Sequence, residues 1–446
     1  MAMRTGEDNA MQEWQHDIPT RYFTTYEALE EAFRRRVAGL VPRYHAGIRI
    51  FWDDFQRIYD RPTPASEVYE AYITSNPRDC LAFGTPFQVL QGAWLSARRR
   101  TADPPDPPDK VAERFGLGAH LHQSIRSLSG GETVRLAMAK VHLLAACAGR
   151  LTVASPFSWL ALDHWGDFRQ LANRYRACGT DVELFALEGE DTVAPAVAEE
   201  GTGPAALPFA WRLKSLHLDL GSLLDHLHDR PVCAEVANVD ESLTSPCLFW
   251  GDNGQGKSLV AKALAGAISF KGEAAVRGPE GVRRVRLLFQ DVLNQTLMRS
   301  MGQLVPRPRA DETAVVYDEL RESVQRRVVP SGRPLLPFAE KRKNAAPLGL
   351  LEIKILLAAV RLVDRQSVLI LDEPDWGLSR DDAVAYVTAV VHAAHGRGVP
   401  VIVISHKPWW QHLARSVRCF RKEPTSPQDA GHLFRIRITR LPEGAS

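Results

Sequence analysis

An eight-residue string in the second half of the chain has the residue types that bind phosphate. It reads GDNGQGKS and fits the pattern G-x-x-x-x-G-K-S. In such a string the glycines let backbone N–H groups turn towards a phosphate, Lys257 reaches the outer phosphates, and Ser258 can bind Mg²⁺. A strand-like run, PCLFW, precedes the string and a helical pattern, SLVAKALAGAI, follows it, which is the context that a phosphate-binding loop needs. The candidate phosphate-binding residues are therefore Gly251, Asn253, Gly254, Gly256, Lys257 and Ser258.

Two adjacent acids follow an apolar run further along the chain. The segment SVLILDEP ends in Asp372 and Glu373, at the point where a buried strand would emerge. Buried acids are costly unless they have a partner or a function. Downstream of a phosphate-binding loop, Asp372 would hold Mg²⁺ and Glu373 would polarise an attacking water as a general base.

With these two motifs the second half resembles the ATP-binding-cassette (ABC) ATPases, and two further residues extend the resemblance. Gln290 in RLLFQD matches the Q-loop glutamine of that family, and His406 in VIVISHK matches its switch histidine. The resemblance implies catalytic roles for Glu373, Gln290 and His406. It also implies that Ser258, Gln290 and Asp372 hold the metal, with ATP and Mg²⁺ as the cofactors.

The first half contains a string that looks like the ABC signature. It reads LSGGE, from Leu128 to Glu132, and is followed by the helical pattern TVRLAMAKVHLL. The matching string in the second half, from Leu348 to Glu352, reads LGLLE, so leucines stand where glycines would let backbone approach a phosphate. The signature residues that the resemblance implies for nucleotide binding are Ser129, Gly130 and Gly131.

The other motifs are missing from the first half. No G-x-x-x-x-G-K string precedes Leu128, and LTVASP places Ala154 and Ser155 where the two acids would stand. The region DVELFALEGE has no histidine. The losses in the two halves are complementary, because one composite site keeps every expected part while the other has lost its parts from both sides. We therefore expect an internal pseudo-dimer that binds one functional ATP between the first half's signature and the second half's Walker motifs.

The elements that would position these residues predict an α/β protein. Strand-like runs alternate with helical patterns, which favours a largely buried sheet. These runs are Trp211–Leu220, Pro246–Trp250, Val368–Leu371, Val399–Ile404 and His432–Leu441. Residues 311–327 predict a helix inside an inserted helical subdomain. The resemblance implies two RecA-like P-loop cores, each with a helical subdomain, arranged as an internal pseudo-dimer.

The length of 446 residues predicts two or three domains. We expect a degenerate ABC-type domain over residues 1–190, a linker over 191–207 and an intact ABC-type domain over 208–446. The linker assignment rests on the lack of apolar periodicity and the mix of Pro, Gly, Ala and acids. The four prolines of TADPPDPPDK, residues 101–110, predict a loop without regular structure.

Composition excludes several classes of protein. With 45% hydrophobic and 24% charged residues the chain is neither disordered nor fibrous, and six cysteines without a C-x-x-C pair favour neither a zinc ribbon nor a disulfide framework. The most apolar runs are of strand length, and the N-terminus lacks the order of a secretory signal. We expect a cytoplasmic protein or one peripheral to the inner face of a membrane.

The sequence leaves alternatives for what an ATP-driven motion of the protein would act on. The first is a soluble tandem ATPase that acts on a protein partner, and the second is the ATP-binding motor of a multi-chain ABC importer with a separate membrane permease. An ABC-F-like translation factor ranks lower, because such factors usually have two intact sites and a long charged linker. A non-hydrolysing sensor is disfavoured because Glu373 and His406 are both present. The net charge of +2 gives no strong attraction to nucleic acid, which is not an expected partner.

Overall fold

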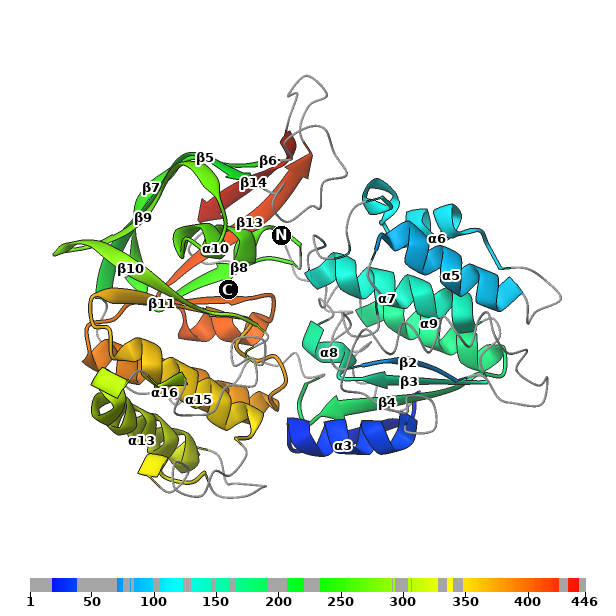
Figure 1. Cartoon of the computed structure of the whole chain (residues 1–446), viewed down its shortest axis with the longest axis horizontal. Coiled ribbons are helices and arrows are strands. Elements are labelled where there is room, and N and C mark those ends of the chain that lie inside the picture. Colours follow the sequence, from blue (N-terminus) through cyan, green and yellow to red (C-terminus); the bar gives the residue numbers. More distant parts are fainter. Residues whose placement is uncertain are drawn as a thin grey trace. The chain divides into compact units, whose positions relative to one another are not determined.

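The computed structural model of the chain divides into two compact units, Met1–Asp191 and Thr192–Ser446. Figure 1 shows the helices and strands of each unit. The structure describes residues 18–37, 70–74, 81, 84–98, 105–122, 125, 128, 130–145, 149–159, 165–190, 207–219, 233–252, 254–290, 292, 304–305, 307–327, 335–339, 348–424 and 432–440. The expected linker lies outside these residues except for its last position, and so do Ser129 and Asn253.

The first unit is built on a four-stranded parallel sheet with the strand order β1-β4-β3-β2. The central strands are almost wholly buried, as expected for parallel strands that are covered on both faces. The strands are β1 (Thr20–Phe23), β2 (Glu70–Ile73), β3 (Arg150–Ala154) and β4 (Asp181–Leu187).

Helices cover both faces of this sheet. The connection from β1 to β2 runs across the sheet in the opposite direction to the connections from β2 to β3 and from β3 to β4. Because such crossovers are right-handed, α3 (Tyr26–Val37) lies on one face, and α7 (Gly130–Ala145) and α9 (Trp165–Ala177) lie on the other (Figure 1). Helix α5 (Pro86–Arg98) packs on α7.

The proline-rich segment of the first unit is more ordered than the sequence predicts. Residues 101–104 lie outside the described residues, but α6 (Pro108–Arg114) begins within the segment that we expected to be a loop. Its first residue is a proline, which a helix tolerates there because the first N–H groups of a helix have no partner within it. The prolines therefore mark the start of a helix. Two short elements complete the described helices, η2 (Gly118–His120) and α8 (Pro156–Trp159).

The second unit contains a parallel core with the strand order β8-β12-β11-β10. Both β11 and β12 are buried along their whole length, which explains their continuous apolar sequences. The strands are β8 (Cys247–Trp250), β10 (Gly281–Leu288), β11 (Ser367–Asp372) and β12 (Val401–Ser405). The strand predictions at these positions are confirmed.

Further strands extend this core and curl it back on itself. The order continues from β8 through β13 and β14 to β6, and from β10 through β9 to β5, while β6 also pairs with β5. The sheet is thus closed, and β7 adds to β5 outside the ring. These strands are β5 (Leu207–Asp219), β6 (Cys233–Val236), β7 (Val239–Ser245), β9 (Phe270–Gly278), β13 (Ser416–Pro424) and β14 (His432–Arg440).

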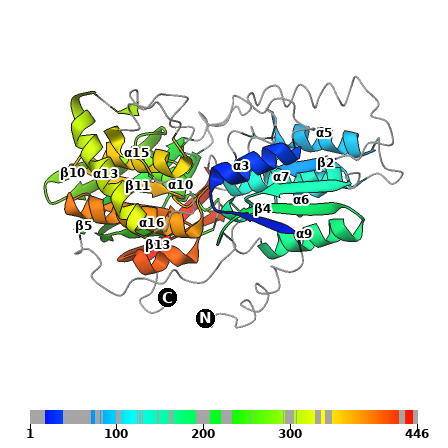
Figure 2. The ribbon, with the colours of Figure 1, turned by 90° about the horizontal axis from the view of Figure 1, so that it is seen from below.

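The second unit has its longer helices on one side of the core. These are α13 (Ala310–Arg327), α15 (Leu350–Leu362) and α16 (Arg380–Gly396), and they lie on the side of the core strands opposite α10 (Lys257–Leu264) (Figure 1, Figure 2). The predicted helix over 311–327 is confirmed by α13. Two 3₁₀ turns, η5 (Arg307–Arg309) and η6 (Pro408–Leu413), precede α13 and follow β12. None of the described helices is both long and apolar enough to cross a membrane.

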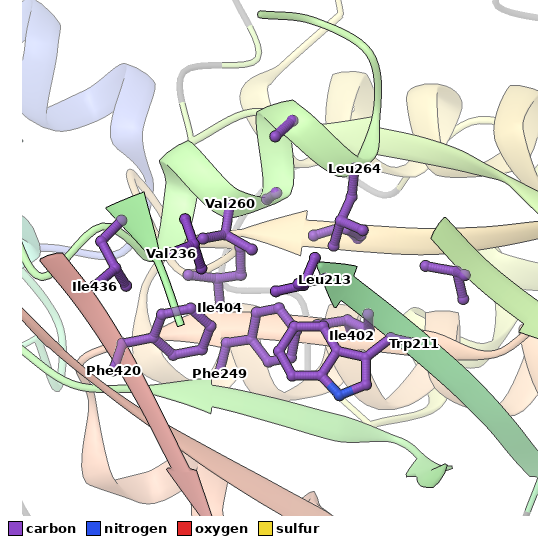
Figure 3. Packing of buried hydrophobic residues seen from close by; sticks show 14 of the residues in the cluster. Trp211, Leu213, Val236, Phe249, Val260, Leu264, Ile402, Ile404, Phe420 and Ile436 are labelled. Atoms are coloured by element: carbon purple, nitrogen blue, oxygen red, sulfur yellow. The ribbon is translucent and has the colours of Figure 1, made fainter. Parts of the chain in front are cut away.

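Helix α10 lies inside the closed sheet, and its side chains complete the main core of the second unit. Val260 and Leu264 of the helix pack with side chains from strands that are far apart in the sequence (Figure 3). The strand residues in this cluster include Trp211, Leu213, Val236, Phe249, Ile402, Ile404, Phe420 and Ile436. Each fully buried side chain of this size contributes about 1.5–3 kcal/mol through burial. The core therefore fixes α10, and with it the loop that precedes α10.

Candidate functional site

The candidate phosphate-binding loop connects the end of β8 to the start of α10. Gly251, Gly254 and Gly256 all have positive φ, at 142°, 84° and 92°, which side chains rarely allow. A Cβ at Gly251 would lie 2.7 Å from the backbone oxygen of Phe420, and one at Gly256 would lie 2.4 Å from Cδ1 of Ile436. The backbone thus favours glycine at all three positions, and strands β13 and β14, which pack against the loop, also leave no room for a side chain at Gly251 and Gly256.

Lys257 is the first residue of α10, and its ammonium group is folded over the loop. The side chain is buried, and Nζ donates to the carbonyl oxygens of Gly251, at 2.5 Å, and Asp252, at 2.9 Å. Burial lowers the pKa of the Lys257 ammonium, although nearby carboxylates act in the opposite direction. A buried ammonium at a helix N-terminus, beside a glycine loop, forms a cationic environment that favours an anion.

Asp372 and Ser258 meet at the carboxyl end of β11. The Ser258 hydroxyl donates to Oδ1 of Asp372 at 2.8 Å. Burial, and then the neighbouring Glu373, raise the pKa of Asp372 to about 6. A hydroxyl and a carboxylate fit Mg²⁺, which is usually held by one or two carboxylates together with phosphate oxygens and water. Among the described residues no group of three or more His, Cys, Asp or Glu could hold a metal by itself, so Mg²⁺ here would also need phosphate oxygens.

Glu373 and His406 form a buried pair beside Asp372. Nδ1 of His406 lies 3.1 Å from Oε1 and 3.0 Å from Oε2 of Glu373, and the Ser405 hydroxyl lies 3.4 Å from Oε2. Burial raises the pKa of the Glu373 carboxyl, but His406, with Lys257 and Lys407, outweighs burial and leaves that pKa below its usual value. Nε2 of His406 is buried and finds no hydrogen-bond partner among the described residues. The pair therefore presents a charged carboxylate and an unused ring nitrogen.

Gln290 lies at the same edge of the sheet. Leu288 of β10 pairs with Leu371 of β11 in parallel register, so the residues that follow these two leucines emerge together. Gln290 is half-buried and follows Leu288 by two residues. The second unit thus brings Lys257, Ser258, Gln290, Asp372, Glu373 and His406 to the carboxyl edge of one parallel sheet, where ligands of open α/β folds bind.

The described residues of the first unit include no counterpart of the phosphate-binding loop. Its strand order β1-β4-β3-β2 matches β8-β12-β11-β10, so β1 and α3 correspond to β8 and α10. Six residues connect β8 to α10, whereas Thr24 and Thr25 alone connect β1 to α3. Thr25 caps α3 by accepting the N–H of Ala28 at 3.3 Å. A connection of two residues has no room for a glycine cradle around a phosphate.

The end of β3 in the first unit has the same backbone shape as the end of β11 in the second. Asp372 pairs with Ile404 and Ala154 pairs with Phe185, so Ser155 corresponds to Glu373. Ser155 and Glu373 both have left-handed backbones, with φ of 50° and 45°. Each donates its N–H to the neighbouring strand, Ser155 to Phe185 at 2.6 Å and Glu373 to Ile404 at 2.9 Å.

At the carboxyl ends of β3 and β4, the first unit has a different set of side chains. The same register places Leu187, which is fully buried, at the position of His406. The Ser155 hydroxyl donates to Oε1 of Glu190 at 2.9 Å and lies 2.9 Å from the Ser158 hydroxyl, while the Leu187 N–H donates to Oε2 of Glu190 at 2.8 Å. A buried carboxylate already satisfied by these groups takes the place of the Glu–His pair.

The two signature strings differ in the groups that lie at the start of the helix that follows each of them. In the second unit Gly349 precedes α15, Leu350 is buried, and the Gly349 N–H donates to Oε2 of Glu352 at 2.9 Å. The N-terminus of α15 is therefore occupied by a carboxylate of its own helix, which disfavours a phosphate there. In the first unit Gly130 and Gly131 open α7, and Glu132 pairs with His120 at 3.3 Å. Ser129 lies outside the described residues.

Three buried residues near the site were not singled out from the sequence. They are Lys354, Asp375 and Lys407, with exposed fractions of 1%, 6% and 1%. Ser379, at the end of the loop that contains Asp375, caps α16 by accepting the N–H of Asp382 at 3.2 Å. No local sequence signal marks a lysine as buried, because lysine is usually exposed.

Comparison with known proteins identifies ATP-binding relatives. Thiamine import ATP-binding protein ThiQ of Ruegeria sp. is 28% identical over 168 residues, which are 35% of this chain and 69% of that protein. Zinc import ATP-binding protein ZnuC of Ruegeria pomeroyi is 26% identical over 156 residues, which are 35% of this chain and 56% of that protein. The matches thus leave about two thirds of this chain uncovered. No protein-family model matches the chain.

Solved structures resemble a larger part of the chain. A chain from a model of ribosome-bound archaeal Pelota and ABCE1 covers 90% of this chain and 70% of its own length, with a TM-score of 0.55 and 16% identity. At that identity the likeness concerns the fold alone.

Proposed function

We propose that this chain, which belongs to the ABC-class ATPases, binds and hydrolyses one ATP per molecule and uses the resulting motion on a protein partner. The observation that carries the proposal is a group of side chains at one sheet edge, in which half-buried Ser258 lies with buried Lys257, Asp372, Glu373 and His406. In the first unit, a two-residue connection takes the place of the phosphate-binding loop, and a Ser155–Glu190 hydrogen bond takes the place of the Glu373–His406 pair. Both differences support the binding of a single nucleotide.

The phosphates would be held by the loop between Gly251 and Gly256 and by Lys257. Its ammonium would exchange the carbonyl oxygens of Gly251 and Asp252 for phosphate oxygens. Ser258 and Asp372 would hold Mg²⁺, with Gln290 as a further ligand. When bound, Mg²⁺ would neutralise charge that develops on the phosphates.

Hydrolysis would depend on Glu373 and His406. The depressed pKa of Glu373 keeps its carboxylate charged near neutral pH, so that it can accept a proton from the attacking water. His406 is held by Glu373 through Nδ1, which leaves Nε2 for a phosphate oxygen, to which it donates in the imidazolium form.

The first unit would contribute its signature to the same ATP. In this proposal Ser129, Gly130 and Gly131 close over the γ-phosphate, and the glycines allow backbone to approach it. ATP would then stabilise the closed form, and hydrolysis would release it, which is a population shift between two states.

Steady-state ATPase measurements test the proposal. We expect Mg-dependent phosphate release by the wild-type chain and none by Lys257→Ala. The matched control is Lys271→Ala, which removes an exposed lysine from β9 and should leave turnover unchanged. No hydrolysis by the wild type, or equal hydrolysis by both lysine variants, would reject the proposed activity.

The relatives favour a second candidate for the partner. Both are import ATP-binding proteins by name, so the chain could instead be the motor subunit of an importer whose permease is a separate chain. Purifying tagged Glu373→Gln protein from its native cells with Mg-ATP in mild detergent separates the two. Stoichiometric recovery of an integral membrane protein supports the importer, and recovery of a soluble complex supports the remodelling ATPase.

A further inference from the structure

The backbone of Glu373 is held in a conformation that costs energy. Its φ of 45° is in the left-handed region, which non-glycine residues adopt only when their surroundings impose it. The loop after it forms two tight turns, in which the Trp376 N–H donates to the backbone carbonyl oxygen of Glu373 at 3.1 Å and the Leu378 N–H donates to that of Asp375 at 3.0 Å. These turns bend the loop back on itself but do not attach it to the rest of the unit.

One attachment comes from α15. Lys354 is 1% exposed, and its Nζ donates to the carbonyl oxygen of Pro374 at 2.7 Å. The Tyr386 hydroxyl of α16 donates to the Lys354 carbonyl at 3.3 Å, which ties the same turn of α15 to its neighbouring helix. A hydrogen bond from an ammonium is stronger than one between neutral groups. A lysine is costly to bury, so its retention at this point calls for a role that an apolar residue would not fill.

A second attachment comes from the segment that carries His406. The indole N–H of Trp410 donates to Oδ1 of Asp375 at 3.4 Å, and both side chains are buried. Trp410 lies in η6, which begins two residues after His406. Buried Lys407 lies on the same segment, and it acts on the carboxyls of both Glu373 and Asp375. The loop is thus held at Pro374 from α15 and at Asp375 from η6, on either side of a single peptide bond.

We propose that Lys354 is a positioning residue for hydrolysis, which acts with Trp410 to hold the loop after Glu373 so that the Glu373 carboxylate stays aimed at the attacking water. The proposal rests on the proposed ATPase function. It gives α15 a role within its own unit. Although its signature string has lost the glycines, the helix still carries the lysine that fixes the catalytic loop.

The central variant is Lys354→Met, which keeps the length and volume of the side chain and removes the donor. We expect kcat to fall about ten- to a hundredfold, because small displacements of a catalytic group have large effects on rate. We expect the Kd for ATP to change less than twofold. The melting temperature should change little, because removal of a buried charge offsets the loss of the hydrogen bond to the Pro374 carbonyl oxygen.

The matched control is Ile355→Val, the next position on α15, which removes a buried methylene and touches no proposed catalytic group. It should lower the melting temperature slightly and leave kcat unchanged. A purely structural role for Lys354 predicts the reverse pattern, with stability lost and the rate per folded molecule unchanged. That pattern, or an unchanged kcat in Lys354→Met, would overturn the proposal.

The second attachment is tested with a pair of variants at Asp375. Asp375→Asn keeps an oxygen that can accept the Trp410 N–H, whereas Asp375→Ala does not. We expect Asp375→Ala and Trp410→Phe to lower kcat, and Asp375→Asn to retain most of it. Equal losses in the two Asp375 variants would contradict the hydrogen-bond role of Trp410.

Amide hydrogen exchange in the nucleotide-free protein gives a readout that does not depend on hydrolysis. Lys354→Met should speed exchange at the Trp376 and Leu378 amides, and Ile355→Val should not. A wild type without ATPase activity would defeat the proposed function but leave this test intact. Unchanged exchange in Lys354→Met would show that the lysine does not hold the loop.

Discussion

Two adjacent carboxyl groups at the end of β11 are given opposite properties by their surroundings. Burial raises the pKa of Asp372 to about 6, whereas His406 and the nearby lysines overcome burial at Glu373 and leave its pKa below the usual value. Such divergence between neighbouring acids is typical of sites that assign them different roles. Asp372 bonds to Ser258 and suits a cation, while Glu373 remains a charged base.

Glu373→Gln tests this division at the level of one atom. The amide keeps the shape of the side chain but cannot take a proton, so we expect hydrolysis to fall at least about a hundredfold while ATP binding persists. Phosphate release and filter binding of labelled ATP measure the two effects separately. As a control, Glu352→Gln changes the carboxyl that caps Gly349 and should leave turnover unaltered. A Glu373→Gln variant that hydrolyses ATP at the wild-type rate would contradict the assignment of the base.

Helices α6, α7 and α9 of the first unit are joined through a half-buried histidine, His142. An Arg114 nitrogen lies 2.9 Å from Nε2 of His142, and since the guanidinium can only donate, Nε2 accepts and Nδ1–H donates to the Tyr175 hydroxyl at 3.0 Å. Arg114 also bonds to Asp106 at 2.6 Å. Burial, then Arg114 and Arg174, lower the pKa of His142 to about 4, against a smaller opposing effect of Asp106. The histidine thus links α6, α7 and α9 in its neutral form.

This link makes the stability of the first unit depend on pH. Because the folded pKa of His142 is below the unfolded value of about 6.5, its contribution is complete above that pH and is lost as the pH falls towards 4. We expect the free energy of unfolding to fall by up to about 3 kcal/mol, because a pKa of about 4 in the folded state against about 6.5 in the unfolded state favours protonation of the unfolded chain. Urea unfolding of wild type and His142→Gln between pH 7.5 and 4.5 isolates the effect. Parallel pH curves for the two proteins would rule it out.

The sequence predicts the elements of the second unit well and those of the first unit poorly. Fully buried strands such as β11 and β12 have continuous apolar sequences, and the phosphate-binding loop has a characteristic glycine pattern. These strands and this loop can therefore be predicted from short stretches of sequence. The two-residue turn at Thr24 and Thr25 has no such signal, because its meaning depends on which strand β1 lies beside. The Ser155–Glu190 bond likewise joins residues 35 positions apart.

The candidate site shows the same division. The motifs identified Lys257, Ser258, Asp372, Glu373 and His406, because phosphate and metal chemistry restrict residue type and spacing. Lys354 and Trp410 carry no local signal, because their effect arises from tertiary contacts to the loop after Glu373. The prediction of a loop over residues 101–110 is wrong at its end, because Pro108 is the first residue of α6 and the first turn of a helix accepts proline.

At the scale of the whole molecule, the described residues of the two units carry complementary motifs. Those of the first unit include the signature glycines of α7 but neither a phosphate-binding loop nor a Glu–His pair like that of Glu373 and His406. The second unit has both of these, but Glu352 fills the N-terminus of its own α15. This complementarity is the reason for proposing one ATP site to which both units contribute residues.

Substitution at the two signature strings tests that assembly. Gly131→Asp adds a carboxylate where backbone is expected to approach the γ-phosphate, so we expect turnover to be abolished although Gly131 is about 120 residues from the glycine loop in the sequence. Leu351→Asp makes the same change at the matching position of the second unit and should leave turnover intact. Rates that fall equally in both variants, or in neither, would contradict a single composite site.

The number of ATP molecules bound per chain distinguishes a single nucleotide site from two. Mg-ATP would be titrated into Glu373→Gln by equilibrium dialysis, with a Glu373→Gln and Lys257→Ala double variant as the reference. We expect one ATP per chain for the first protein and none for the second. Two ATP molecules per chain, or one that remains after Lys257 is removed, would contradict it.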